Sequence, residues 1–152
     1  MSGRTGFTDK PRQGLKKTTG EETKLDPKKK ALEIARLALD KQAGKVLIIN
    51  IGKLSSVTDY LVVCSADSER QVQAIARNIE DSLRAKKIKP IGTEGLQSGR
   101  WVLLDYVDVV AHVFLDHVRS YYDIEGLWAE ATVDEIKDRP GKAKKPSAKG
   151  DE

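Results

Sequence analysis

Five side chains that could do acid–base or metal chemistry fall within thirteen positions: Asp105, Asp108, His112, Asp116 and His117. Carboxylates and imidazoles at close spacing are typical of metal sites and of general acid–base catalysis. The residues around them, however, follow strand patterns, in which neighbouring side chains point to opposite faces of a sheet. The five groups therefore do not converge, and the sequence predicts no metal site, no catalytic residue and no cofactor.

A nucleophilic site is also poorly supported. Ser55 or Ser56 could in principle combine with Asp59 and His112, but neither serine lies in the glycine-flanked motif that exposes a catalytic serine. The glycine-rich stretch 92–99 is not followed by a helix whose N-terminus could bind a phosphate. These patterns favour binding over catalysis.

The segment Glu94–Phe114, EGLQSGRWVLLDYVDVVAHVF, is the most informative part of the chain. It places a tryptophan, a tyrosine and a histidine in two consecutive predicted strands. Trp and Tyr dominate the energetics of protein interfaces. Strand alternation puts Trp101, Leu103 and Asp105 on one side, so we expect them to present a binding surface together.

Several elements must position this segment. Asp26 and Pro27 can start one helix, and Ser68 with Gln71 has the spacing of a capping box for another. The predicted elements are a helix from Pro27 ended by a left-handed Gly44, strands over Val46–Ile51 and Tyr60–Ser65, a helix from Ser68 to Leu83, a short edge strand over Ile88–Ile91, a hairpin of Arg100–Tyr106 with Asp108–Phe114, and a helix around His117–Trp128. This order predicts an α/β domain with a mixed sheet of about five strands flanked by helices.

Charge divides the chain into three parts. Residues 1–25 read as a disordered basic tail, 26–130 as the folded domain and 131–152 as a second, largely disordered tail. The net charge of +4 belongs to the ends, because residues 31–130 alone carry more acidic than basic side chains. A mildly acidic domain suits a basic protein surface.

No apolar run is long enough to span a membrane, and the single cysteine, Cys64, lies in an apolar strand. We therefore expect a cytoplasmic protein.

Three blocks, taken together, resemble one known family. SSVTDYLVVCSADSERQVQAIA (Ser55–Ala76), the Glu94–Phe114 segment and RSYYDIEGLW (Arg119–Trp128) are similar to the ribosomal silencing factors, RsfS or Iojap. The resemblance covers the predicted domain from about Ala31 to Trp128. It implies a nucleotidyltransferase-like α/β fold without transferase activity. It also implies a homodimer that binds the large ribosomal subunit through ribosomal protein L-fourteen, blocks joining of the small subunit and so represses translation.

The family blocks also nominate contact residues. The expected partner-facing residues are Trp101, Leu103, Asp105 and Tyr106 from WVLLDY, then Asp59 and Tyr60 from TDY, and Glu94. At one position the chain departs from the family pattern: Val107 stands where glycine is usual. Because valine is strained at positive φ, we expect the turn between the two hairpin strands to differ locally.

Two other functions stay open on the sequence. One is an assembly factor for the large subunit that binds without blocking subunit joining. The other is a divergent nucleotide-binding enzyme that would use Asp59, Asp105 and Asp108. The basic N-terminal tail is in addition a candidate for contact with rRNA.

Overall fold

The computed structural model describes residues 25–137. The tail predicted over residues 1–25 therefore lies outside the described residues except for Leu25, as does the chain beyond Lys137. The described elements are α1 (Pro27–Asp40), β2 (Gly44–Asn50), β3 (Tyr60–Ala66), α2 (Glu69–Ala85), β4 (Gly92–Glu94), β5 (Trp101–Asp105), β6 (Val109–Leu115), α3 (Asp116–Tyr122), α4 (Ile124–Leu127) and β7 (Thr132–Ile136).

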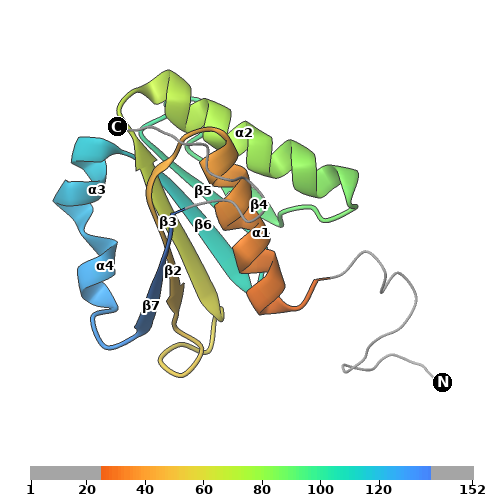
Figure 1. Ribbon diagram of the computed structural model, residues 1–152, viewed down its shortest axis with the longest axis vertical. Helices are drawn as coiled ribbons and strands as arrows, with labels where there is room; N and C mark the ends of the chain where they lie inside the picture. The colour runs from red at the N-terminus through yellow and green to blue at the C-terminus, as the bar shows by residue number, and fades with distance from the viewer. Residues whose placement is uncertain (1–24, 138–152) are drawn as a thin grey trace.

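The strands of the described part form one six-stranded sheet in the order β4-β5-β6-β3-β2-β7 (Figure 1). β3 and β6 run parallel, and every other neighbouring pair is antiparallel. The predicted mixed sheet is thus confirmed, with one strand more than the sequence indicated.

Both long helices begin where their capping residues predict. Asp26 accepts a hydrogen bond from the Lys29 amide at 2.8 Å, and Ser68 accepts one from the Gln71 amide at 3.1 Å. The reciprocal half of the expected capping box does not form. The Gln71 side chain instead donates to the carbonyl of Lys41 and so connects α2 to the end of α1.

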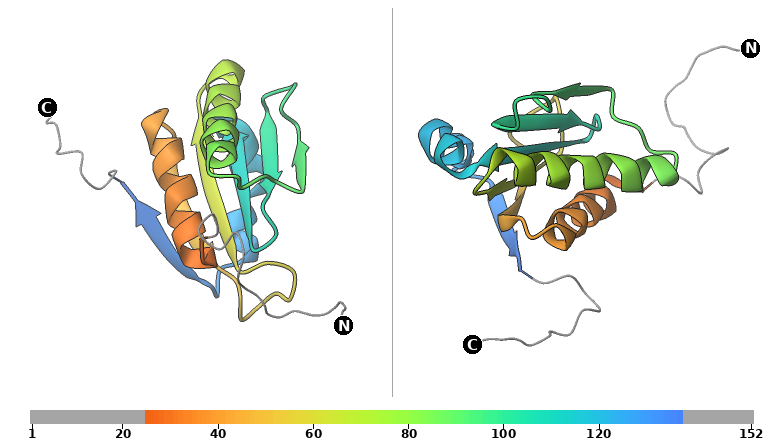
Figure 2. Two further views of the ribbon diagram at one scale, coloured as in Figure 1. Left: turned by 90° about the vertical axis from the view of Figure 1, so that its right-hand side faces the viewer. Right: turned by 90° about the horizontal axis from the view of Figure 1, so that it is seen from above.

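α1 and α2 cover one face of the sheet, which both views of Figure 2 show. The apolar positions of α2, spaced three and four apart, are all buried: Val72, Ile75, Ala76, Ile79 and Leu83. α3 and α4 lie on the other face (Figure 1), where α3 contacts β3 and β6. The helix cover of the second face is therefore partial, because β4 and most of β5 have no helix over them on this side.

Three predicted boundaries were wrong. α1 ends at Asp40 and the left-handed residue is Gln42, with φ 64°, whereas Gly44 already belongs to β2. The edge strand is Gly92–Glu94 rather than Ile88–Ile91, because Pro90 has no amide proton to donate to a ladder. The single helix expected around His117–Trp128 is broken at Asp123, whose φ is 45°.

The C-terminal boundary of the predicted domain was also wrong. Thr132–Ile136, at the start of the tail predicted to be largely disordered over residues 131–152, pairs antiparallel with all but the first two residues of β2. Its side chains are mostly exposed, as is typical of a charged edge strand. The folded domain therefore extends beyond Glu130 to at least Ile136.

The hairpin turn keeps a positive φ at Val107, although the valine led us to expect a locally different turn. Val107 has φ 77°, and the Asp108 amide donates to the Tyr106 carbonyl at 3.0 Å, which is the bonding pattern of a three-residue turn. A β-branched residue at positive φ is a conformational outlier. Lys30 of α1 holds the same turn through a 2.7 Å ion pair with Asp108.

Replacing this valine should stabilise the protein. We expect Val107→Gly to raise the free energy of unfolding by about 1 kcal/mol, because relief of roughly 1–3 kcal/mol of strain exceeds the added chain entropy of glycine. Urea denaturation measures the change. Val57→Gly is the matched control: Val57 is also exposed but has no positive φ, so that variant should gain no stability. Equal effects at the two positions would contradict the strain argument.

Candidate partner-binding face

The strand register decides which side chains share the second face. In β5, Val102 and Leu104 are fully buried on the helix-covered side, and the alternate residues Trp101, Leu103 and Asp105 are half-buried on the other. The prediction that these three residues share one side of their strand is confirmed.

Trp101 is the centre of this face. Its indole packs on Phe114, with ring centroids 4.9 Å apart, and on Tyr122 of α3 at 4.8 Å. Phe114 is fully buried and Tyr122 is half exposed. The indole is therefore supported from the core and from α3 while part of its surface stays accessible.

His112 gives the indole a polar partner. Trp101 Nε1 donates to His112 Nδ1 at 3.0 Å, across the β5–β6 pair. Burial lowers the pKa of His112 to about 4, so the ring is neutral at neutral pH. Because Nδ1 accepts a hydrogen bond, this geometry assigns the ring proton to Nε2. His112 is thus a neutral histidine within the sheet whose Nδ1 has a hydrogen-bond donor.

Carboxylates flank the aromatic centre. Glu94 is exposed on β4 and pairs in register with Leu103. Asp105 accepts a hydrogen bond from the Val107 amide at 2.9 Å, so it also fixes the hairpin turn. We call the set Glu94, Trp101, Leu103, Asp105 and Tyr122 the Trp101 patch. It combines an aromatic and aliphatic centre with two acidic side chains.

The other nominated residues lie elsewhere. Tyr106 is only 2% exposed and points to the helix-covered side with Leu104, so the expectation that it faces a partner was wrong. Tyr60 pairs in register with Val109, which places it on that same side, and Asp59 is exposed at the end of the sheet. The structure therefore brings together four of the seven nominated residues and adds Tyr122, which the sequence could not place beside Trp101.

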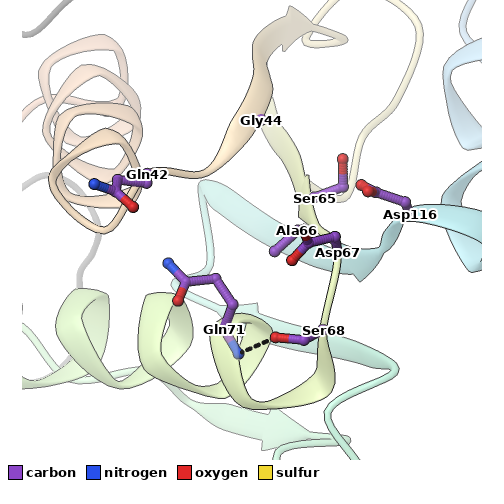
Figure 3. A pocket seen from close by; sticks show the side chains of 8 residues that line it. All are labelled: Gln42, Gly44, Ser65, Ala66, Asp67, Ser68, Gln71 and Asp116. Carbon is purple, nitrogen blue, oxygen red and sulfur yellow. Dashed lines mark hydrogen bonds between the residues drawn. The ribbon is translucent and has the colours of Figure 1, made fainter.

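A crevice opens at the opposite end of the sheet, at the C-terminal ends of β3 and β6 (Figure 3). These parallel neighbours lead into helices on opposite faces, and such a switch point is where open α/β sheets commonly bind ligands. The crevice has a volume of about 350 Å³ and is lined by Gln42, Gly44, Ser65, Ala66, Asp67, Ser68, Gln71 and Asp116. Its charged lining is acidic, which disfavours a polyphosphate.

Three further findings concern residues 25–137. No group of three or more His, Cys, Asp and Glu side chains is arranged there to hold a metal ion. No helix in this part is long and apolar enough to cross a membrane. Cys64 is buried, and desolvation raises the pKa of its thiol to about 12, which makes it an unreactive core residue.

A mixed six-stranded sheet with helices on both faces defines an α/β domain. A crystal structure from Chromobacterium violaceum shares it, with a TM-score of 0.63 and 36% identity over 78% of this chain and 94% of that one. The family model described as "Ribosomal silencing factor during starvation" matches residues 24–152, and the chain belongs to this family.

Individual relatives agree with the family assignment. The ribosomal silencing factor of Bacillus subtilis is 42% identical over 109 residues, which cover 71% of this chain and 92% of that protein. A more distant relative, the mouse protein named "Mitochondrial assembly of ribosomal large subunit protein 1", is 24% identical over 105 residues, 67% of this chain and 46% of its own length.

Proposed function

We propose that this protein binds the large ribosomal subunit through ribosomal protein L-fourteen and represses translation by blocking the joining of the small subunit. The observation that carries the proposal is the Trp101 patch, in a chain that belongs to the ribosomal silencing factors. A partly exposed indole with aliphatic and tyrosine neighbours has the composition of an interface hot spot. Its carboxylates suit the basic surface of a ribosomal protein.

The proposed mechanism requires only that the protein occupy the surface of the large subunit to which the small subunit binds. A domain of this size bound at the surface where the subunits meet would exclude the small subunit, and no bond would be made or broken. We further propose that the protein acts in the cytoplasm as a homodimer and is not an enzyme. Contact of the basic residues 1–25 with rRNA is part of the proposal and concerns residues outside the described part.

A joining assay tests the proposal. Purified full-length protein is incubated with isolated large subunits, small subunits are added, and the particles are separated by sedimentation. We expect the protein to migrate with large subunits and to reduce the fraction of joined particles as its concentration rises. The same protein mixed with small subunits alone is the control and should not co-migrate. Joining that is unchanged at saturating protein would exclude silencing.

The alternative of an assembly factor is favoured by the name of the mouse relative. The same assay separates the two functions. A factor that assists assembly without silencing would co-migrate with large subunits and leave the joined fraction unchanged.

The enzyme alternative makes a different prediction. Because Asp67 and Asp116 line the crevice at the switch point, a nucleotide should bind there poorly. We expect millimolar ATP with Mg²⁺ to shift the thermal midpoint by less than about 1 °C, since a ligand without affinity for the native state cannot stabilise it. A shift of several degrees that Asp116→Asn changes would instead support a nucleotide-binding protein. The nucleotidyltransferase likeness stays a prediction.

A further inference from the structure

His112 lies directly across the strand pair from Leu103, next to the indole of Trp101. The two rings have centroids 6.0 Å apart at 42°, and the bond from Trp101 Nε1 to His112 Nδ1 is 3.0 Å long. It is the one hydrogen bond of the indole within the described residues. The imidazole in turn stacks on Phe114 at 12°, so its own plane is fixed by the core.

The contacts of the Trp101 indole differ in how strictly they fix its orientation. Packing against Phe114 and Tyr122 is apolar and tolerates rotation of the indole within its plane. A hydrogen bond is directional and weakens steeply away from linearity. The acceptor on His112 therefore selects one orientation of the indole among those that the apolar neighbours allow.

The environment of His112 keeps this acceptor available. The residue is 9% exposed, and burial holds its pKa near 4, so Nδ1 is unprotonated at neutral pH. His117, the other histidine of the chain, is exposed on α3. The two histidines thus have different environments, which provides a matched control.

We propose that His112 is a positioning residue for the partner-binding face: its Nδ1 holds the Trp101 indole in the orientation that the partner recognises. The inference deepens the proposed function and depends on it. A histidine that does not touch the partner would then set affinity through the side chain that does.

The test removes the acceptor in one variant and keeps it in another. His112→Phe retains a ring without an acceptor, and His112→Asn retains an oxygen close to the position of Nδ1. All variants carry Trp128→Phe, so that Trp101 gives the only indole signal in NMR and fluorescence. The readouts are the chemical shift of the indole N–H and the affinity for isolated large subunits.

We expect His112→Phe to move the indole N–H signal and to weaken subunit binding about fivefold, the equivalent of one net hydrogen bond. His112→Asn should recover most of that loss. His117→Phe should leave the signal and the affinity unchanged. An unmoved indole signal in His112→Phe, or an equal loss of binding in the Phe and Asn variants, would overturn the proposal.

If His112→Phe folds poorly, a double-mutant cycle is run with His112→Leu, a smaller side chain that also lacks an acceptor. Trp101→Phe removes the donor instead of the acceptor and should weaken binding by a similar factor, and the double variant should lose no more than either single one. Additive losses would overturn the proposal. Failure of the unmodified protein to bind large subunits would instead refute the proposed function, and the indole signal would still report whether the hydrogen bond orients Trp101.

Discussion

Trp101→Ala should reduce the affinity for isolated large subunits at least about 30-fold, which corresponds to roughly 2 kcal/mol or more. The indole is the largest side chain of the Trp101 patch, and Phe114 and Tyr122 hold it in place before any partner arrives. A preformed aromatic contact loses little conformational entropy on binding. Its removal therefore costs nearly the whole contact energy. Co-sedimentation over a series of protein concentrations measures the change.

The control for this experiment is another exposed apolar residue. Leu127 on α4 is 75% exposed and lies outside the Trp101 patch, so Leu127→Ala should bind large subunits as the unmodified protein does. Circular dichroism and urea denaturation check that Trp101→Ala is folded, because the indole also packs on the core residue Phe114. A folded Trp101→Ala protein with unchanged affinity would exclude Trp101 as the contact residue.

Local patterns predicted the elements that position this face. The spacing of apolar residues and the cap at Ser68 were sufficient for α2, since both act within one or two helical turns. Alternation within one strand was sufficient to group Trp101, Leu103 and Asp105. The same alternation places Tyr106 with the buried Leu104. Tyr106 was predicted to face a partner because it belongs to the family block WVLLDY, and such a block does not distinguish contact residues from core residues.

Long-range pairing explains what the sequence could not show. The hydrogen bond between Trp101 and His112 depends on the register of β5 against β6, and the contact of Tyr122 depends on how α3 returns over the sheet. Thr132–Ile136 is a strand only because β2 offers a free edge, and its exposed, charged side chains lack the apolar signal of a core strand.

The largest effect on stability is expected at Arg119. This guanidinium is 7% exposed in the middle of the contact between α3, α4 and the sheet. Its Nη1 donates to Ser65 Oγ at 3.0 Å and to the Gly44 carbonyl at 3.4 Å. Its Nε donates to Glu125 Oε2 at 2.9 Å, and Nη2 lies 2.8 Å from the same oxygen. One side chain thus connects β2, β3 and α4.

We expect Arg119→Met to lower the free energy of unfolding by about 2–3 kcal/mol in urea denaturation. Removing one member of a buried ion pair typically costs about 3–5 kcal/mol, and the smaller figure applies because the Glu125 side chain is 26% exposed and can be hydrated. Methionine keeps most of the aliphatic volume, so the loss reports the polar contacts rather than a cavity.

Two comparisons isolate this contribution. Arg84→Met removes an exposed arginine, whose pair with Asp81 spans 3.8 Å, and should change stability by less than about 0.5 kcal/mol. Adding Glu125→Gln to Arg119→Met should recover part of the loss, because it removes the carboxylate left without its cation. If Arg119→Met were as stable as Arg84→Met, then apolar packing alone would hold α3 and α4 on the sheet. The support that α3 gives to Trp101 through Tyr122 would then not depend on this buried cation.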